Sequence, residues 1–246
     1  MPTESESARA RSGQTDEPQP LSRASRTPRS AAVAGIVFSV LFTLALVLVH
    51  SATPKDPNDA GVWLTDKSRR DMVLVALGLV PFAGIAFLWF VGVVRDRIGE
   101  AEDRFFATVF LGSGLLFVAL LFVTAALAAG LVTSAGDNAS LFRSSDAWQV
   151  GRGATYQLMT IYAMRMAAVF TIATSTILHR VGLAPRWLVV TGYATGAVLL
   201  VTLAFTTWVE LLFPLWVFVL SMYVLIAGSR SRTAERGAVR ESLGAS

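Results

Sequence analysis

Residues 105–131 read FFATVFLGSGLLFVALLFVTAALAAGL and contain no charged side chain. A helix needs roughly 20 apolar residues to cross the hydrocarbon core of a bilayer, so this stretch is long enough to span a membrane. Five further apolar stretches of comparable length accompany it, at 31–50, 72–94, 155–178, 187–207 and 211–228. The sequence therefore predicts an all-α membrane protein whose core is a six-transmembrane-helix bundle.

The composition supports a membrane protein and excludes several kinds of chemistry. Hydrophobic residues make up 54% of the chain and charged residues only 15%, which departs from the usual composition of a soluble domain. The chain has no cysteine, so thiol nucleophiles, thiolate-bound zinc and iron–sulfur clusters are excluded. The net charge of +4 comes from basic residues spread over short segments beside the apolar stretches, an arrangement that predicts no nucleic-acid partner.

The positions of lysine and arginine predict the orientation of the bundle. Basic residues cross membranes reluctantly and gather on the cytoplasmic side. The two tails and the two short connections on their side carry more than twice as many basic residues as the other three connections. Those other connections are 51–71, 132–154 and 208–210, and only the basic cluster at 67–70 opposes the bias. We expect both termini to be cytoplasmic, in a cell (plasma) membrane.

The same pattern divides the chain into three parts. Residues 1–30 are rich in Ser, Arg, Pro, Glu and Gln and hold almost no large apolar side chain, so they cannot bury enough surface to fold. We expect a disordered cytoplasmic tail there, a six-helix transmembrane domain at 31–228, and a second disordered cytoplasmic tail at 229–246.

Small residues predict where helices pack closely, because close backbone approach drives helix association in lipid. The fifth stretch has Gly192 and Gly196 in a GxxxG pattern. The fourth stretch carries small residues at helical spacing: Thr160, Ala163, Ala167, Thr171 and Thr174. We expect these faces to pack within the bundle or between protomers. Trp63 and Trp148, in the long connections, are expected to anchor in the headgroup layer.

One charged residue lies inside an apolar stretch. Arg165 is about 9 Å below the outer end of the fourth helix, when that helix is taken to span from about Met159 to Arg180. A central arginine costs about 2.5 to 3.5 kcal/mol in a bilayer, so it usually has a partner or a wet cavity. Its offset of about 200° from Ala163 and Ala167 directs it away from the small face.

Three roles remain open for this arginine. An ion pair with Glu210 would clamp the fourth helix against the last hairpin. An outward-facing pocket lined by Thr155, Gln157, Tyr162 and Glu210 would instead let Arg165 bind an anionic group. Extension of the side chain to an outer-leaflet phosphate is the third role. The ligand-binding candidates are therefore Arg165, Glu210, Tyr162 and Gln157.

No stretch carries a recognisable catalytic, cofactor-binding or metal-binding motif. The two histidines, His50 and His179, are expected at opposite ends of their helices, about a bilayer apart, so they cannot share a haem or a metal ion. The sequence has no glycine-rich phosphate loop and no HExxH motif. We therefore expect no enzymatic activity, no cofactor and no metal ion.

The chain resembles the many uncharacterised multi-pass membrane proteins of high-GC actinobacteria. The resemblance rests on arginine-rich connections, a Ser/Arg tail, and the run Arg165-Met166-Ala167-Ala168-Val169-Phe170 leading to Pro185-Arg186-Trp187. It implies a plasma-membrane location and no particular activity. The first functional hypothesis is assembly in the lipid bilayer with a membrane protein partner or as a homo-oligomer. The second is a carrier or binding protein for a small anionic or amphipathic solute, using Arg165.

Overall fold

The computed structural model describes residues 27–53, 61–98, 104–136, 139–182, 184–201 and 208–227. Within these ranges every regular element is helical, with no strand. The elements are α2 (Thr27–Ala52), η2 (Val62–Thr65), α3 (Lys67–Ile98), α4 (Arg104–Ala135), α5 (Ala139–Arg143), α6 (Asp146–Gln157), the π-helical turn η5 (Leu158–Ala163), α7 (Met164–Val181), α8 (Arg186–Val201), η6 (Val209–Leu211) and a last helix at 212–227. Nearly all of both tails predicted to be disordered lies outside the described residues.

Among the described residues, five helices are long and apolar enough to cross a membrane, which makes the chain a multi-pass membrane protein. They are Ser30–Ala52, Lys67–Arg95, Phe105–Ala135, Asp146–Val181 and Val209–Ala227. The remaining apolar stretch, predicted at 187–207, forms the shorter helix α8, and residues 202–207 lie outside the described part of the chain. The predicted helical membrane bundle is thus confirmed. Among the described residues, five of the six predicted spans are long helices and the other is the shorter helix α8.

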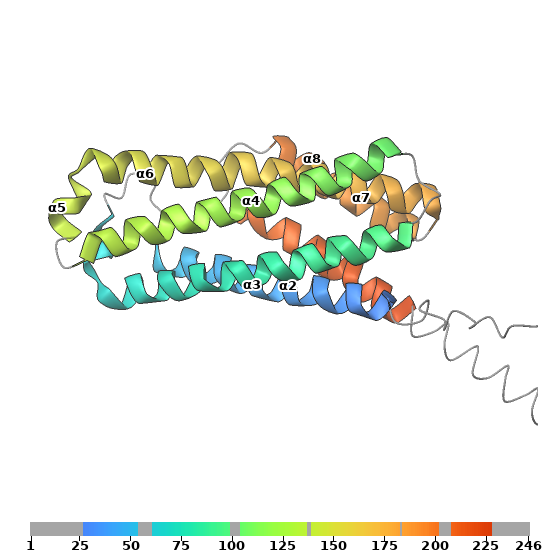
Figure 1. Ribbon diagram of the computed structural model, residues 1–246, viewed down its shortest axis with the longest axis horizontal. Helices are drawn as coiled ribbons and strands as arrows, with labels where there is room; N and C mark the ends of the chain where they lie inside the picture. Colours follow the sequence, from blue (N-terminus) through green and yellow to red (C-terminus); the bar gives the residue numbers. More distant parts are fainter. Residues whose placement is uncertain are drawn as a thin grey trace, which may run out of the picture.

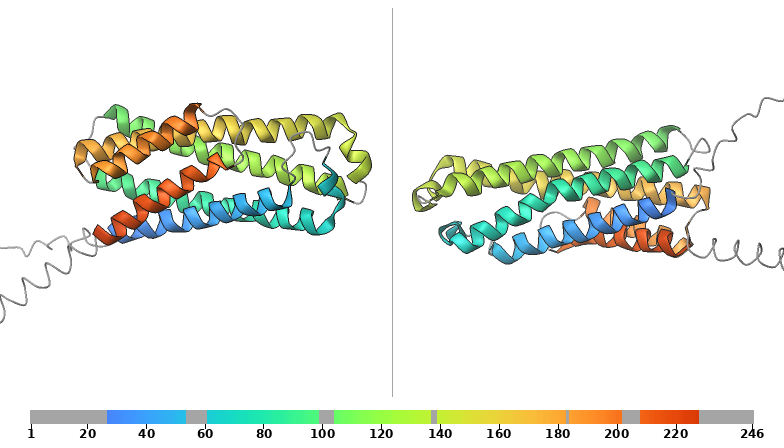
Figure 2. Two further views of the ribbon diagram at one scale, coloured as in Figure 1. Left: turned by 180° about the vertical axis from the view of Figure 1, so that it is seen from behind. Right: turned by 60° about the horizontal axis from the view of Figure 1, so that its bottom comes forward.

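The helices lie side by side in one elongated bundle (Figure 1). We call the end that holds α5 the cap end, and the opposite end, where α2 begins and the last helix finishes, the tail end (Figures 1 and 2). The helices α3 and α4 have 32 residues each and so measure about 48 Å. Because a hydrocarbon core is about 30 Å thick, both helices extend beyond it.

Phenylalanine side chains fill the centre of the bundle. The ring of Phe213, on the last helix, packs against Phe38, Phe87 and Phe117 at centroid distances of 4.9 to 5.8 Å. Eight rings, each at most 1% exposed, form this aromatic core: Phe38, Phe42, Phe87, Phe90, Phe110, Phe117, Phe170 and Phe213. They come from α2, α3, α4, α7 and the last helix, so all the long helices meet at a filled centre.

Close backbone contacts hold α8 against α7, as the GxxxG pattern predicts. A Cβ atom added at Gly196 would come within 2.5 Å of Ile172 Cγ1 and 3.1 Å of the Ala168 carbonyl oxygen. A Cβ atom at Gly192 would overlap Ser175 Oγ. These glycines therefore pack within the chain, against the side of α7 that carries Ala168, Ile172 and Ser175.

Described residues of two of the connections predicted as outer loops, 51–71 and 132–154, form a cap with its own small core. Its buried residues are Ala52, Leu64, Val73, Val132, Ala135, Ala139 and Trp148. The prediction that Trp148 anchors in the headgroup layer is wrong, because its side chain is only 5% exposed and packs under the chain at Gly61. Gly61 has φ of +80°, a conformation that favours glycine, and a side chain there would clash with the indole ring. Trp63 packs beside the same core, partly buried.

Replacing Gly196 with leucine is expected to destabilise the bundle, by about 1 to 3 kcal/mol, because the larger side chain must push α8 away from α7. The matched control is Gly78→Leu, since a Cβ atom at Gly78 meets no neighbouring atom within 4 Å. The measurement is the fraction of protein that remains monodisperse in detergent after heating to graded temperatures. Equal midpoints for the two variants would contradict the proposed close packing.

Candidate functional site

Three of the four candidate residues lie on one long helical segment. Gln157 is the last residue of α6, Tyr162 lies in the π-helical turn η5, and Arg165 is the second residue of α7. Glu210 lies in η6, at the start of the last helix. The segment 146–181 is therefore the element that positions most of the site.

The π-helical turn directly precedes Arg165. The backbone N–H of Met164 bonds to the carbonyl oxygen of Met159, five residues earlier, as well as to that of Ile161. A π-helical turn is rare and is often found at functional sites. Residues 158–163 contain no glycine or proline that would mark it in the sequence, so sequence reasoning missed this feature.

The candidate side chains on this segment face outward. Gln157 and Tyr162 are exposed, Tyr162 to 56%, and Arg165 is partly exposed. Ala163 and Ala167, on the packing face, are fully buried. Arg165 therefore does project away from the small face, and the neighbouring polar groups lie on the outer surface of the bundle.

The helix α8 covers only part of α7. The Tyr193 hydroxyl bonds to Thr176 Oγ1 at 2.8 Å, and Gly196 lies against Ile172, so the two helices run antiparallel. Continuing this register places Val201, the last described residue of α8, roughly level with Ala167. Arg165 thus lies beyond the described end of α8.

The structure does not contain the ion pair between Arg165 and Glu210. Arg165 forms no ion pair or hydrogen bond with any residue in the described ranges. Glu210 forms no ion pair with any described residue, and Trp208, two residues before it, stacks on His50 of α2. The clamp hypothesis is therefore not supported by the geometry.

A small cluster of His50, Trp208 and Glu210 forms where α2 and the last helix meet. The His50 ring stacks on the Trp208 indole at a centroid distance of 5.4 Å and an angle of 24°. Its Nδ1 donates a hydrogen bond to the Leu46 carbonyl oxygen at 2.8 Å, which fixes the ring orientation. Sequence reasoning placed His50 at a helix end but missed this cluster, because residues so far apart in sequence meet only through the antiparallel packing of the two helices.

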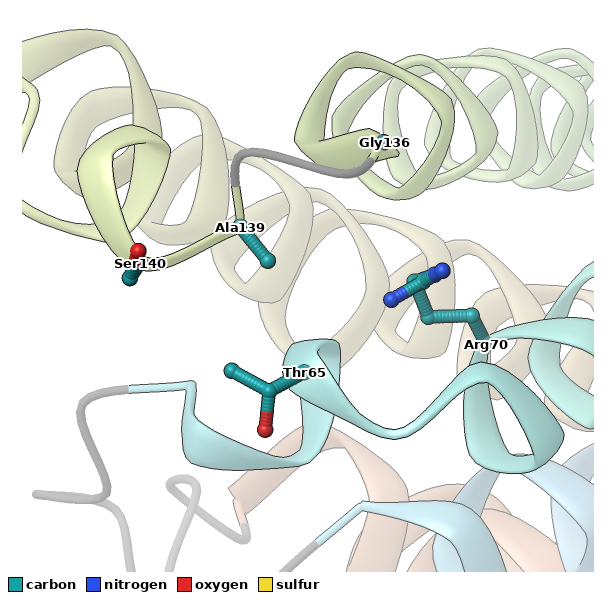
Figure 3. A pocket seen from close by; sticks show the side chains of 5 residues that line it. All are labelled: Thr65, Arg70, Gly136, Ala139 and Ser140. Carbon is teal, nitrogen blue, oxygen red and sulfur yellow. The ribbon is translucent and has the colours of Figure 1, made fainter.

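Two cavities in the described structure contain arginine, and neither is lined by any of the four candidates. The first, about 190 Å³, lies in the cap among Thr65, Arg70, Gly136, Ala139 and Ser140 (Figure 3). The guanidinium of Arg70 points toward Gly136 and Ala139 (Figure 3), and its Nη1 donates to the Leu64 carbonyl oxygen at 2.6 Å. Arg70 therefore ties η2 to the start of α3.

The second cavity, about 230 Å³, lies between α3 and α4 near the tail end. Its lining residues are Arg95, Ala107, Thr108, Leu111, Gly112 and Leu115. Neither of these two cavities is lined by Arg165, Gln157, Tyr162 or Glu210.

Comparison with protein-family models, curated proteins and solved structures gives no match. The function is therefore inferred from the geometry of the chain itself.

Two double-mutant cycles distinguish the pairings open to Glu210. We expect the stability effects of His50→Ala and Glu210→Gln to be non-additive by 0.5 kcal/mol or more, the order of coupling found for residues in contact. The effects of Arg165→Leu and Glu210→Gln are expected to add within about 0.5 kcal/mol. Both cycles are measured by thermal unfolding in detergent. Strong coupling in the second cycle alone would instead support an ion pair between Arg165 and Glu210.

Proposed function

We propose that this chain is a non-enzymatic integral membrane protein that acts by assembly with membrane partners, as a six-span protein of the plasma membrane with cytoplasmic termini. The observation that carries the proposal is that Arg165 is partly exposed and forms no ion pair or hydrogen bond with any described residue, on a segment that also exposes Gln157 and Tyr162. Polar side chains on the surface of a membrane helix form hydrogen bonds across helix interfaces. A partner helix that supplies a carboxylate or another acceptor satisfies this guanidinium.

The centre of the bundle favours assembly over transport. A carrier needs a path for its solute, and the aromatic core occupies the space between the long helices. The two cavities near arginine lie elsewhere. The interacting groups of the chain are therefore on its outside, where another membrane protein or a second copy reaches them.

A carrier or binding protein for a small anionic or amphipathic solute is the second candidate function. The π-helical turn at Leu158–Ala163 favours it, since an irregular turn beside a membrane-embedded charge is a common feature of ligand sites. In this case Arg165 binds the anionic group of the solute from the outer surface.

The proposed topology is supported by where the two ends of the described chain lie. The start of α2 and the end of the last helix meet at the tail end (Figure 2), as an even number of crossings requires. The tail end also holds Arg95, Arg180 and Arg186, near the ends of α3, α7 and α8. The excess of basic residues therefore supports assigning the tail end to the cytoplasm.

Because the chain has no cysteine, single cysteines report its topology directly. We expect Ser144→Cys, at an exposed position in the cap, to react with a membrane-impermeant maleimide in intact cells. Ala184→Cys, in the turn between α7 and α8, is expected to react only after permeabilisation. The opposite labelling pattern would reverse the orientation, and labelling of both sites in intact cells would contradict the single crossing by Asp146–Val181 that separates them.

The surface that carries Gln157, Tyr162 and Arg165 is called the Arg165 face. Assembly through this face is tested by photocrosslinking in living cells. A benzoylphenylalanine at Tyr162 is expected to crosslink one discrete protein or a second copy of the chain, and Arg165→Leu to abolish that product. The same probe at Trp89, an exposed position on α3, is the matched control and should give no such product. A crosslink unchanged by Arg165→Leu would contradict the assignment of this face.

A measurement of bound solute distinguishes the second candidate function from assembly. Mass spectrometry of protein purified in mild detergent detects any anionic solute that wild type holds and Arg165→Leu loses. Such a solute, together with no protein crosslink at Tyr162, would replace assembly by solute binding. Equal thermal midpoints of the two proteins establish that the loss is not due to unfolding.

A further inference from the structure

The second cavity is a groove along α4 whose direction follows the helix axis. Its α4 residues occupy positions 107, 108, 111, 112 and 115, which lie on one side of the helix over two turns. At 1.5 Å per residue the groove is about 12 Å long. It begins near the start of α4, at the tail end, and runs toward the middle of the bundle (Figure 1).

The floor of the groove is apolar and is left open by glycine. Ala107, Leu111 and Leu115 supply most of the lining. A Cβ atom at Gly112 would meet no neighbouring atom within 4 Å, so this position has space for a ligand. The groove therefore suits a hydrocarbon chain lying parallel to α4.

One end of the groove carries a cation at the edge of the membrane. Arg95 is the last residue of the membrane-spanning segment Lys67–Arg95, and its side chain is exposed. It forms no ion pair or hydrogen bond with any residue of the described ranges. An anionic group at the headgroup level is its natural counterion.

We propose that this groove binds one anionic phospholipid, with an acyl chain along Ala107, Leu111 and Leu115 and the phosphate at Arg95. The two features coincide in the way that such a lipid requires, with the charge at the membrane surface and the apolar strip directed inward. A soluble anion would gain nothing from the apolar floor. A zwitterionic lipid presents a cationic amine beside its phosphate, so Arg95 selects the anionic headgroup. This site is separate from Arg165 and does not depend on the proposed assembly.

Native mass spectrometry tests the proposal on the full-length protein in detergent with equal amounts of phosphatidylglycerol and phosphatidylcholine. Wild type is expected to retain phosphatidylglycerol up to about fivefold more than phosphatidylcholine, as one basic residue near a membrane surface allows. Arg95→Gln should reduce the ratio to about one, and Arg95→Lys should largely preserve it. Arg165→Leu should leave it unchanged, which separates this groove from lipid held at Arg165.

The groove itself is tested by filling it. Gly112→Leu should reduce the retention of both lipids, because the side chain occupies the space of the acyl chain. Gly130→Leu is the matched control on the same helix, where a Cβ atom also meets nothing within 4 Å. The proposal is overturned if wild type retains both lipids equally, if Arg95→Gln keeps the preference, or if Gly130→Leu loses lipid as Gly112→Leu does. Should Gly112→Leu not fold, the Arg95 variants decide alone.

Discussion

The packing of Phe213 against four other helices is the interaction on which the bundle depends. Its ring contacts Phe38 on α2, Phe87 on α3, Phe117 on α4 and Phe170 on α7, at interplanar angles of 61° to 87°. These are tilted or edge-to-face arrangements, which suit the quadrupoles of aromatic rings and add about 0.5 to 1.5 kcal/mol per pair. In lipid, apolar burial alone gives little driving force, so shape and contact decide how helices pair. One side chain thus fixes the last helix relative to all the other long ones.

Because the centre of the bundle is filled, the polar side chains that can interact with other molecules lie on its outer surface or at its ends. The hydroxyls of Thr171, Thr174 and Ser175 on α7 all donate to carbonyl oxygens one turn earlier, so the buried small face is neutral and already satisfied. These hydroxyls present no unsatisfied group to a ligand, and Ser175 also lies against Gly192 of α8. The groups left for interaction are Arg165 with its neighbours on the outer surface, Arg95 in its groove, and the folded cap.

The sequence predicts the parts of this fold that depend on local composition. Apolar length identifies the long helices, and the spacing of Gly192 and Gly196 identifies α8 as a closely packed helix, although it does not name α7 as the neighbour. The burial of Trp148 was not predictable, because it depends on η2 and α5 folding over one another across the cap. The π-helical turn before Arg165 and the approach of His50 to Glu210 were missed for the same reason. Both are set by tertiary packing, which leaves no periodic signal in one sequence.

For the candidate site, sequence reasoning identified the residue and its direction but not its surroundings. The spacing of Arg165 from Ala163 and Ala167 is a property of one helix, so its outward projection followed from helical geometry alone. The pairing with Glu210 required two helices to bring their ends together, and it is His50 of α2 that lies at this end of the last helix, stacked on Trp208. A single charge in apolar sequence indicates that a partner is needed and does not identify it.

The energetic cost of Arg165 explains why its surroundings matter for function. An arginine near the middle of a membrane helix costs about 2.5 to 3.5 kcal/mol, while a whole domain is stable by only about 5 to 15 kcal/mol. Hydrogen bonds between membrane helices contribute about 0.6 kcal/mol on average, so ordinary contacts offset little of that cost. Among the described residues no acceptor reduces it, and Tyr162, three residues before Arg165 on the same helical segment, is exposed. A bound anion or a partner helix with an acceptor lowers the free energy of this site more than any rearrangement of the filled core, and this difference favours association at the Arg165 face.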